Sequence, residues 1–218
     1  MHHQKPEFQE TSIILIGDFN PQIFQPAWFA EQNLIRQQEA EMSDIDLINP
    51  DMVSFSLDWM QLQVLKKRFF VGTTQQPYDE VLRDLVLGTF GLLTQTPIEA
   101  MGINTERHFK MHSEQQWHDF EQRLVPKQLW NDMLDSPSLH SLTMKGQHPD
   151  GQNGFIRVQV EPSVKIQQGI SFNVNHHYQV KNTENVFSSE ELIDILGHGW
   201  HSARDRANQI IEHLLEST

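Results

Sequence analysis

The alternation of apolar and polar residues along the chain predicts many short strands joined by turns. An apolar run at 12–17 ends at Gly17 and Asp18, which is typical of a buried strand closed by a turn. The same criteria predict a mainly antiparallel sheet whose other strands are short and turn-bounded. These further strands are expected at 42–48, 52–58, 60–71, 97–110, 139–147, 154–164 and 168–181.

Three regions have the residue spacing of helices that bury one face. Pro77 opens the first, whose apolar residues recur as far as Leu93. The region 113–134 predicts a helix followed by a shorter one with four large side chains turned inward. Gly197 fits the position after a helix end, so the closing region predicts two helices, the second burying Trp200. The inward side chains of the shorter helix are Leu129, Trp130, Met133 and Leu134.

Each half of the chain therefore has the order strand, short helix, several strands, long helix. This order predicts an α+β fold, a curved antiparallel sheet with two long helices on one face, as in TATA-binding-protein-like or helix-grip-like architectures. We expect a single domain over 1–218, with an internal duplication relating halves at about 1–95 and 96–218. The uncovered sheet face is then the place for a ligand, although a fold analogy alone assigns no function.

Composition places the chain among ordinary globular proteins. It has 218 residues, of which 38% are hydrophobic and 21% charged. No apolar run has the roughly 18–20 residues that cross a bilayer, and the start has no apolar signal region, so no membrane association is expected. Cysteine is absent, which removes disulfides and thiolate chemistry and favours a cytoplasmic location.

The formal charge of −13 is spread evenly along the chain. Residues 1–110 hold 15 of the 29 acidic residues and 8 of the 16 basic ones. Direct contact with nucleic acid is therefore disfavoured, because phosphate binding requires clustered Lys and Arg. The one basic cluster, Lys66–Lys67–Arg68, is interpreted as a solvated strand edge.

The segment 18–29 combines four aromatic residues with two prolines. Its prolines and Asn20 account for a turn from a strand into a helix. Four rings are more than such a turn requires, and aromatic residues are common anchors of protein interfaces. Phe24, Trp28 and Phe29 are therefore the candidates for binding a protein partner.

Two predicted strands carry polar residues on one face. Alternation within 170–180 places Asn173, Asn175 and His177 together, whereas His176 points to the core. Asn104 and His108 share a face of the strand 97–110 by the same parity. This polar face is either plainly solvated or the binding surface for a partner or a polar ligand.

Catalytic and metal-binding patterns are lacking. His108 and His112 would share a helix face, but a strand separates them by about 13 Å, so no metal site is assigned. The chain has no GxSxG, GxxxxGK[ST], HExxH or GxGxxG motif. No catalytic residue and no cofactor is therefore expected, and an enzyme is disfavoured.

Five short stretches together are similar to a sporadically distributed, uncharacterised bacterial protein family of about 200–260 residues. The resemblance covers most of the chain and implies a setting in mobile gene neighbourhoods, where defence against phage is a common theme. It supplies no catalytic residues. The stretches are 17–21, 26–29, 83–85, 96–104 and 173–177.

These observations favour a non-catalytic binding or scaffold subunit of a multi-protein bacterial assembly, with a protein partner. A first alternative is a small-ligand-binding protein or enzyme that uses the polar sheet face. A second alternative is an acidic inhibitor or nucleic-acid mimic, since acidic proteins can occupy basic clefts. The even distribution of charge gives the mimic the least support.

Overall fold

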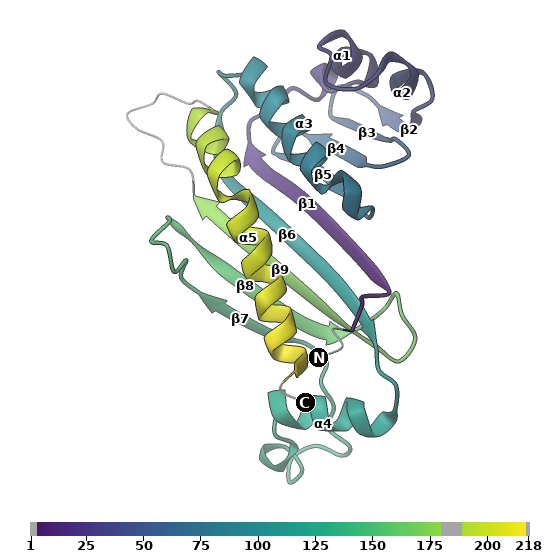
Figure 1. Ribbon diagram of the computed structural model, residues 1–218, viewed down its shortest axis with the longest axis vertical. Helices are drawn as coiled ribbons and strands as arrows, with labels where there is room; N and C mark the ends of the chain where they lie inside the picture. The colour runs from purple at the N-terminus through teal and green to yellow at the C-terminus, as the bar shows by residue number, and fades with distance from the viewer. Residues whose placement is uncertain (1–3, 180–188, 217–218) are drawn as a thin grey trace.

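The computed structural model describes residues 4–179 and 189–216, and its main feature is one nine-stranded antiparallel sheet (Figure 1). The strand order is β2-β3-β4-β5-β1-β6-β9-β8-β7. The predicted α+β class is confirmed, but the sheet is open and uncurled rather than curved as expected. The strands are β1 (Phe8–Gly17), β2 (Asp44–Ile48), β3 (Met52–Ser56), β4 (Gln61–Leu65), β5 (Arg68–Thr73), β6 (Ile98–Lys110), β7 (Leu142–Gly146), β8 (Gly154–Pro162) and β9 (Gly169–Gln179).

Helices lie against one face of this sheet and at its two ends. Figure 1 shows α3 and α5 side by side on the same face, and they contact each other as well as the central strands. The short helices α1 and α2 lie near β2 and β3, and α4 lies beyond the opposite end of the long strands. The helices are η1 (Pro21–Ile23), α1 (Pro26–Glu31), α2 (Gln37–Glu41), η2 (Gln76–Tyr78), α3 (Asp79–Leu92), α4 (Glu114–Leu124), η3 (Lys127–Leu129) and α5 (Glu190–Glu216).

The spacing of apolar residues explains how α3 and α5 attach to the sheet. In α3, Leu82, Leu85 and Phe90 are buried on one face, and two acidic residues in the first turn suit the helix dipole. The closing region is one continuous helix of 27 residues, so the predicted break at Gly197 is wrong. Buried apolar positions continue in register from Leu192 through Ile211, and this unbroken contact with the sheet carries the helix across the glycine.

The predicted strand 60–71 is in fact a hairpin of β4 and β5. Its turn contains Lys66 and Lys67, whose ammonium groups pair with Asp51 at 2.5 Å and Asp18 at 3.3 Å. All four side chains are largely exposed. Lys66 and Lys67 therefore form a solvated turn with weak surface ion pairs rather than a strand edge, and Arg68 begins the interior strand β5 with its side chain partly buried.

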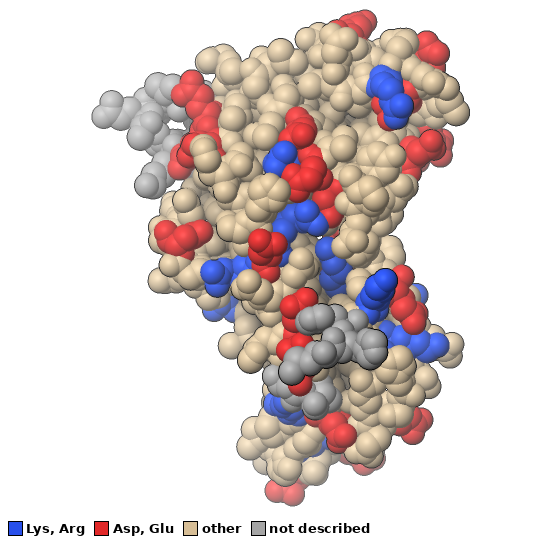
Figure 2. Space-filling view, viewed as in Figure 1, with Lys and Arg blue, Asp and Glu red and all other residues tan. Residues whose placement is uncertain are grey.

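Positive and negative side chains are interspersed on the helix-bearing side of the molecule (Figure 2). Arg83 of α3 pairs with Glu80 at 2.6 Å, and Arg204 of α5 pairs with the buried Asp79. Arg83 and Arg204 are thus neutralised by ion pairs within α3 and between the two helices. Within the described residues, no helix combines the length and apolar character needed to cross a membrane.

Candidate functional site

The sheet face opposite α3 and α5, here called the open face, collects the polar residues singled out in the sequence. Strands β6 and β9 are neighbours, and side chains directly opposite in register lie on the same face. Asn104 is in register with Asn175 of β9 and with Ser12 of β1. The structure therefore brings together residues from two strands that are distant in the sequence, since Asn104 and Asn175 are 71 positions apart. They are Asn104, His108, Asn173, Asn175 and His177.

Two of these side chains form a buried amide pair. The Asn175 Nδ2 group donates to Asn104 Oδ1 at 2.7 Å, and the two residues are only 9% and 8% exposed. Gly102 lies beside them, where a Cβ atom would come within 2.7 Å of Asn175 Nδ2. The centre of the open face is therefore an ordered polar surface with little exposed area, and it differs in this from a freely solvated face.

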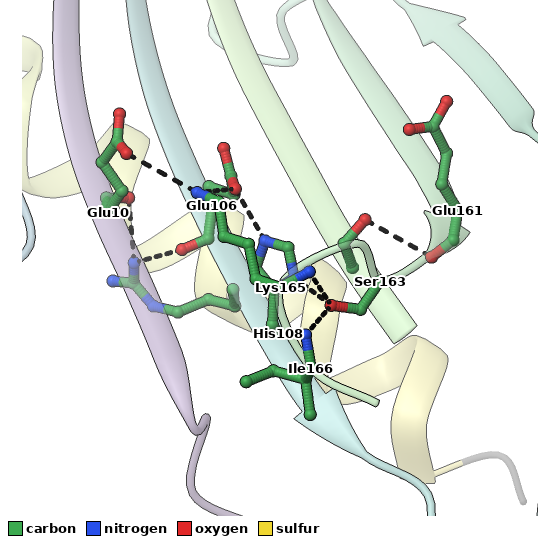
Figure 3. Close-up of polar contacts among 9 residues, drawn as sticks. Glu10, Glu106, His108, Glu161, Ser163, Lys165 and Ile166 are labelled. Carbon is green, nitrogen blue, oxygen red and sulfur yellow. Dashed lines mark hydrogen bonds and ion pairs between the residues drawn. The ribbon is translucent and has the colours of Figure 1, made fainter. Parts of the chain in front are cut away.

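A hydrogen-bonded chain of three residues lies near one end of the open face (Figure 3). His108 Nδ1 lies 2.6 Å from Ser163 Oγ, and His108 Nε2 lies 2.6 Å from Glu106 Oε1. Ser163 comes from the loop between β8 and β9, which folds back over β6. Its Oγ atom already accepts the backbone N–H groups of Lys165 at 3.1 Å and Ile166 at 2.8 Å. The Ser163 hydroxyl therefore donates to Nδ1, and the imidazole donates from Nε2 to Glu106.

Lys165 joins this chain to the neighbouring strand β1. Its Nζ atom donates to Glu106 Oε1 at 2.8 Å and lies 3.9 Å from Glu10 Oε2. Burial raises the pKa of Glu106, but the hydrogen bonds from Lys165 and His108 outweigh it and hold the pKa below its ordinary value. Burial and the charge of Glu106 raise the pKa of Glu10. The cluster is thus arranged around one anionic carboxylate, that of Glu106.

The order Ser163–His108–Glu106 resembles that of a hydrolytic triad, but the geometry does not suit acyl transfer. A nucleophilic hydroxyl needs an available lone pair, whereas Ser163 Oγ accepts two N–H bonds. An oxyanion needs backbone donors, whereas the Ser163 N–H donates to Gly169 O at 2.8 Å. His108 is also 2% exposed. The hydrogen-bonded series Ser163–His108–Glu106 therefore holds the β8–β9 loop on the open face, and we call it the clamp.

Sequence reasoning missed most of this clamp. Glu106 could have been found from the sequence, because alternation places Glu106 on the same strand face as His108. Glu10 required knowledge that β1 and β6 pair, and Ser163 and Lys165 required the path of a loop. No local pattern in the sequence contains that information.

The adjacent histidines of β9 point to opposite faces, as alternation predicted. His177 lies on the open face, where its ring stacks on Phe155 at 4.5 Å between centroids. His176 lies on the helix side and is 3% exposed, and its Nε2 atom has no hydrogen-bond partner among the described residues. The core position of His176 agrees with the alternation of β9, but a hydrogen-bond partner for Nε2 does not accompany it in the described part of the chain. Burial, with smaller effects from His148 and Arg206, lowers the pKa of His176 to about 4.

The aromatic–proline segment is mostly part of the core. Phe24 and Phe29 are 1% and 0% exposed, and Phe24 packs at 5.5 Å between centroids against Phe69 of β5. Their proposed contact with a partner is therefore corrected, because rings that cover the sheet cannot also present a surface. Trp28 keeps partial exposure beside Phe29, so its role as an anchor stays a prediction.

A different group of large apolar side chains is exposed. We define the apolar segment as Leu129, Trp130, Met133 and Leu134, which follow α4 near the lower end of the molecule in Figure 1. They were expected to point inward from a short helix, but only the 3₁₀ turn η3 (Lys127–Leu129) is formed there, and the four side chains stay exposed. The exposed fractions are 74%, 45%, 83% and 53% in that order.

The described part of the chain contains no group of three or more His, Asp or Glu side chains placed to hold a metal ion. The candidate features thus lie in two places: the paired amides and the clamp on the open face, and the exposed apolar segment after α4. Neither a scan against protein-family models nor a search of curated proteins finds a match to this chain.

Proposed function

We propose that this protein is a non-catalytic binding subunit that docks a protein partner through the apolar segment. The observation that carries the proposal is the exposure of four large apolar side chains within six residues. Single exposed apolar residues are normal on a protein surface, but a contiguous group of this size marks an interaction site. Trp and Met are also enriched in interface cores.

A groove beside the segment gives the partner a place to insert. It has a volume of about 260 Å³, and Trp130 and Leu134 line it together with Val125 and Leu139. At its side, Glu121 is buried, accepts the Leu139 N–H and pairs with Lys127 at 2.6 Å. These bonds hold the groove wall in place before any partner arrives, which lowers the ordering cost of binding.

The charges around the segment indicate the partner's chemistry. Asp132 and Asp135 alternate with the apolar residues and are exposed, and no ion pair to either is found within the described part of the chain. A partner helix with an apolar stripe flanked by Lys or Arg would fit this pattern.

The other readings receive different support. The enzyme alternative is less favoured, because the Ser163 Oγ atom already accepts hydrogen bonds from two backbone N–H groups. The strand order supports an internal duplication, since β5-β4-β3 extend from β1 as β9-β8-β7 extend from β6. A setting in bacterial phage defence stays an expectation from the family resemblance.

The test compares two double variants in the cell from which the protein comes. Leu129→Ser with Met133→Ser removes the most exposed apolar groups of the segment. The control, Met42→Ser with Val164→Ser, removes two other apolar groups that are 70% and 96% exposed. Tagged proteins are expressed at the native level, and co-purifying proteins are quantified by mass spectrometry.

We expect a stoichiometric partner with the wild-type and control proteins and a loss of at least tenfold with the segment variant. The isolated pair should then re-form from purified components. Equal recovery with both variants would overturn the proposal. A shift of the purified protein alone from monomer to dimer in light scattering, abolished by the segment variant, would instead identify the partner as a second copy.

A further inference from the structure

The part of the open face formed by β7, β8 and β9 carries two cations with no acidic partner. Lys145 of β7 and Arg157 of β8 are directly opposite in register, and both are exposed. Among the described residues, neither forms an ion pair. Like charges directly opposite on neighbouring strands destabilise a sheet. In a chain with 29 acidic and 16 basic residues, this placement points to a ligand rather than to folding.

An aromatic pair lies in the neighbouring row of the same face. Phe155 of β8 and His177 of β9 are in register and stack at 4.5 Å with an interplanar angle of 23°. Lys145 Nζ lies 3.9 Å from the Phe155 centroid, so one outer face of the stack is already covered by a cation. Burial lowers the pKa of His177, and the charges of Lys145 and Arg157 lower it further, as expected for a locally positive surface.

The other side of the stack faces Gly102 of β6 and the amides beside it, since a Cβ atom at Gly102 would lie 2.7 Å from Asn175 Nδ2 and 3.7 Å from Asn104 Nδ2. Gly102 of β6 is in register with His177 on one side and with Ile14 of β1 on the other. Strands lie about 4.8 Å apart, so His177 and Ile14 flank the glycine at about 9.5 Å. Because the glycine has no side chain, the paired amides of Asn104 and Asn175 occupy the space next to its backbone and form a polar floor beside the His177 ring.

We propose that this part of the open face binds single-stranded nucleic acid, with one base against His177 over the paired amides of Asn104 and Asn175, and the backbone phosphates on Arg157 and Lys145. The paired amides read the edge of the base. The proposal is independent of the apolar segment, which lies at the lower end of the molecule.

The spacing of the cations favours a strand over a free nucleotide. Arg157 and Lys145 lie two and three strands from Gly102, which places them about 10 Å and 14 Å across the sheet. Two separate phosphates are needed to engage both. Open sheets that bind single strands likewise combine stacking side chains with a charged track. The net charge of −13 describes the whole molecule, whereas binding depends on the local field of this face.

The test is fluorescence anisotropy with a 12-nucleotide fluorescein-labelled oligouridine and its oligothymidine counterpart at 50 to 200 mM salt. The variants are Lys145→Gln with Arg157→Gln, and Phe155→Leu. Arg206→Gln is the control, because Arg206 is exposed on α5 and therefore lies on the other side of the sheet. Circular dichroism melts check that every variant is folded.

We expect the wild type and the control to bind alike, and the double charge variant to bind at least tenfold more weakly. Its slope of log K against log salt should become shallower by about 1.4, since each phosphate contact on a single strand contributes about 0.7. Phe155→Leu should weaken binding about fivefold or more by disturbing the stack, with no change in the salt slope.

Three results would overturn the proposal. One is no binding to either oligonucleotide at 50 mM salt. A second is equal weakening by Arg206→Gln and by the double charge variant. The third is full competition by polyglutamate together with unchanged binding in Phe155→Leu, which would identify a site for acidic protein. Uridine monophosphate at equal nucleotide concentration should not compete, and if it does, the site takes free nucleotides.

Discussion

Replacing His176 by Phe should make the protein markedly more resistant to mild acid. The His176 ring is buried on the helix side of β9, where its centroid lies 5.6 Å from that of His148, and its pKa lies at about 4. The unfolded chain binds the proton at the ordinary histidine pKa of about 6.5. Between about pH 6.5 and 4, the unfolded state therefore binds a proton that the folded state does not bind. Stability falls as pH decreases from about 6.5 toward 4, and Phe removes this loss.

The size of the effect follows from the two pKa values. One pKa unit corresponds to about 1.36 kcal/mol. With values of about 6.5 unfolded and 4 folded, the loss relative to pH 7.5 is about 1.4 kcal/mol at pH 5.5 and about 2.5 kcal/mol at pH 4.5. A loss of this size is a large fraction of the stability of an ordinary domain.

The assay is urea unfolding of the wild type and His176→Phe at pH 7.5, 5.5 and 4.5. Carboxylates and the other histidines titrate in both proteins, so the difference in unfolding free energy isolates His176. His112→Gln, which removes an exposed histidine, is the control. A difference between wild type and His176→Phe that stays constant within about 0.5 kcal/mol across this range would refute the reasoning.

Three further predictions concern other buried groups. Arg204→Met leaves the Asp79 carboxylate buried without the Arg204 cation, so the free energy of unfolding measured in urea should fall by about 3–5 kcal/mol. Adding Asp79→Asn should restore at least half of this loss, and no restoration would argue against the ion pair. Phe24→Ala should reduce stability by about 3–5 kcal/mol and Trp28→Ala by less than half as much, and the reverse order in thermal melts would contradict the assigned burial. Ser163→Ala should reduce the free energy of unfolding by about 1–3 kcal/mol, because it removes the hydrogen bonds of the hydroxyl group. Wild-type Ser163 should not react with a fluorophosphonate probe, and labelling at this residue would support a catalytic triad instead.

The open face shows what a single sequence can supply. Alternation correctly assigned Asn104 and Asn175 to the polar faces of their strands, because side-chain direction in a strand depends only on parity. It could not supply their hydrogen bond, which depends on β6 and β9 being neighbours in a given register. Register is a property of distant pairing, and no local pattern encodes it.

The apolar segment shows the opposite limit. The spacing of Leu129, Trp130, Met133 and Leu134 indicated one shared face, and burial was inferred from that. A shared face says which residues would lie together on a helix, but it does not guarantee a surface for them to pack against. Here the regular helix ends at Leu124, and the side chains remain exposed.

The central position of β1 has a consequence for the synthesis of the chain. β1 leaves the ribosome before the other eight strands of the sheet, yet it is hydrogen-bonded to β5 on one side and to β6 on the other. Its second edge stays unpaired until β6, which ends at Lys110, has emerged, so a nascent chain carries an exposed apolar edge until then. Such long-range pairing slows folding and favours aggregation of incomplete chains. A fragment ending near residue 95 should therefore associate through β1, whereas the full chain hides that edge in the middle of its sheet.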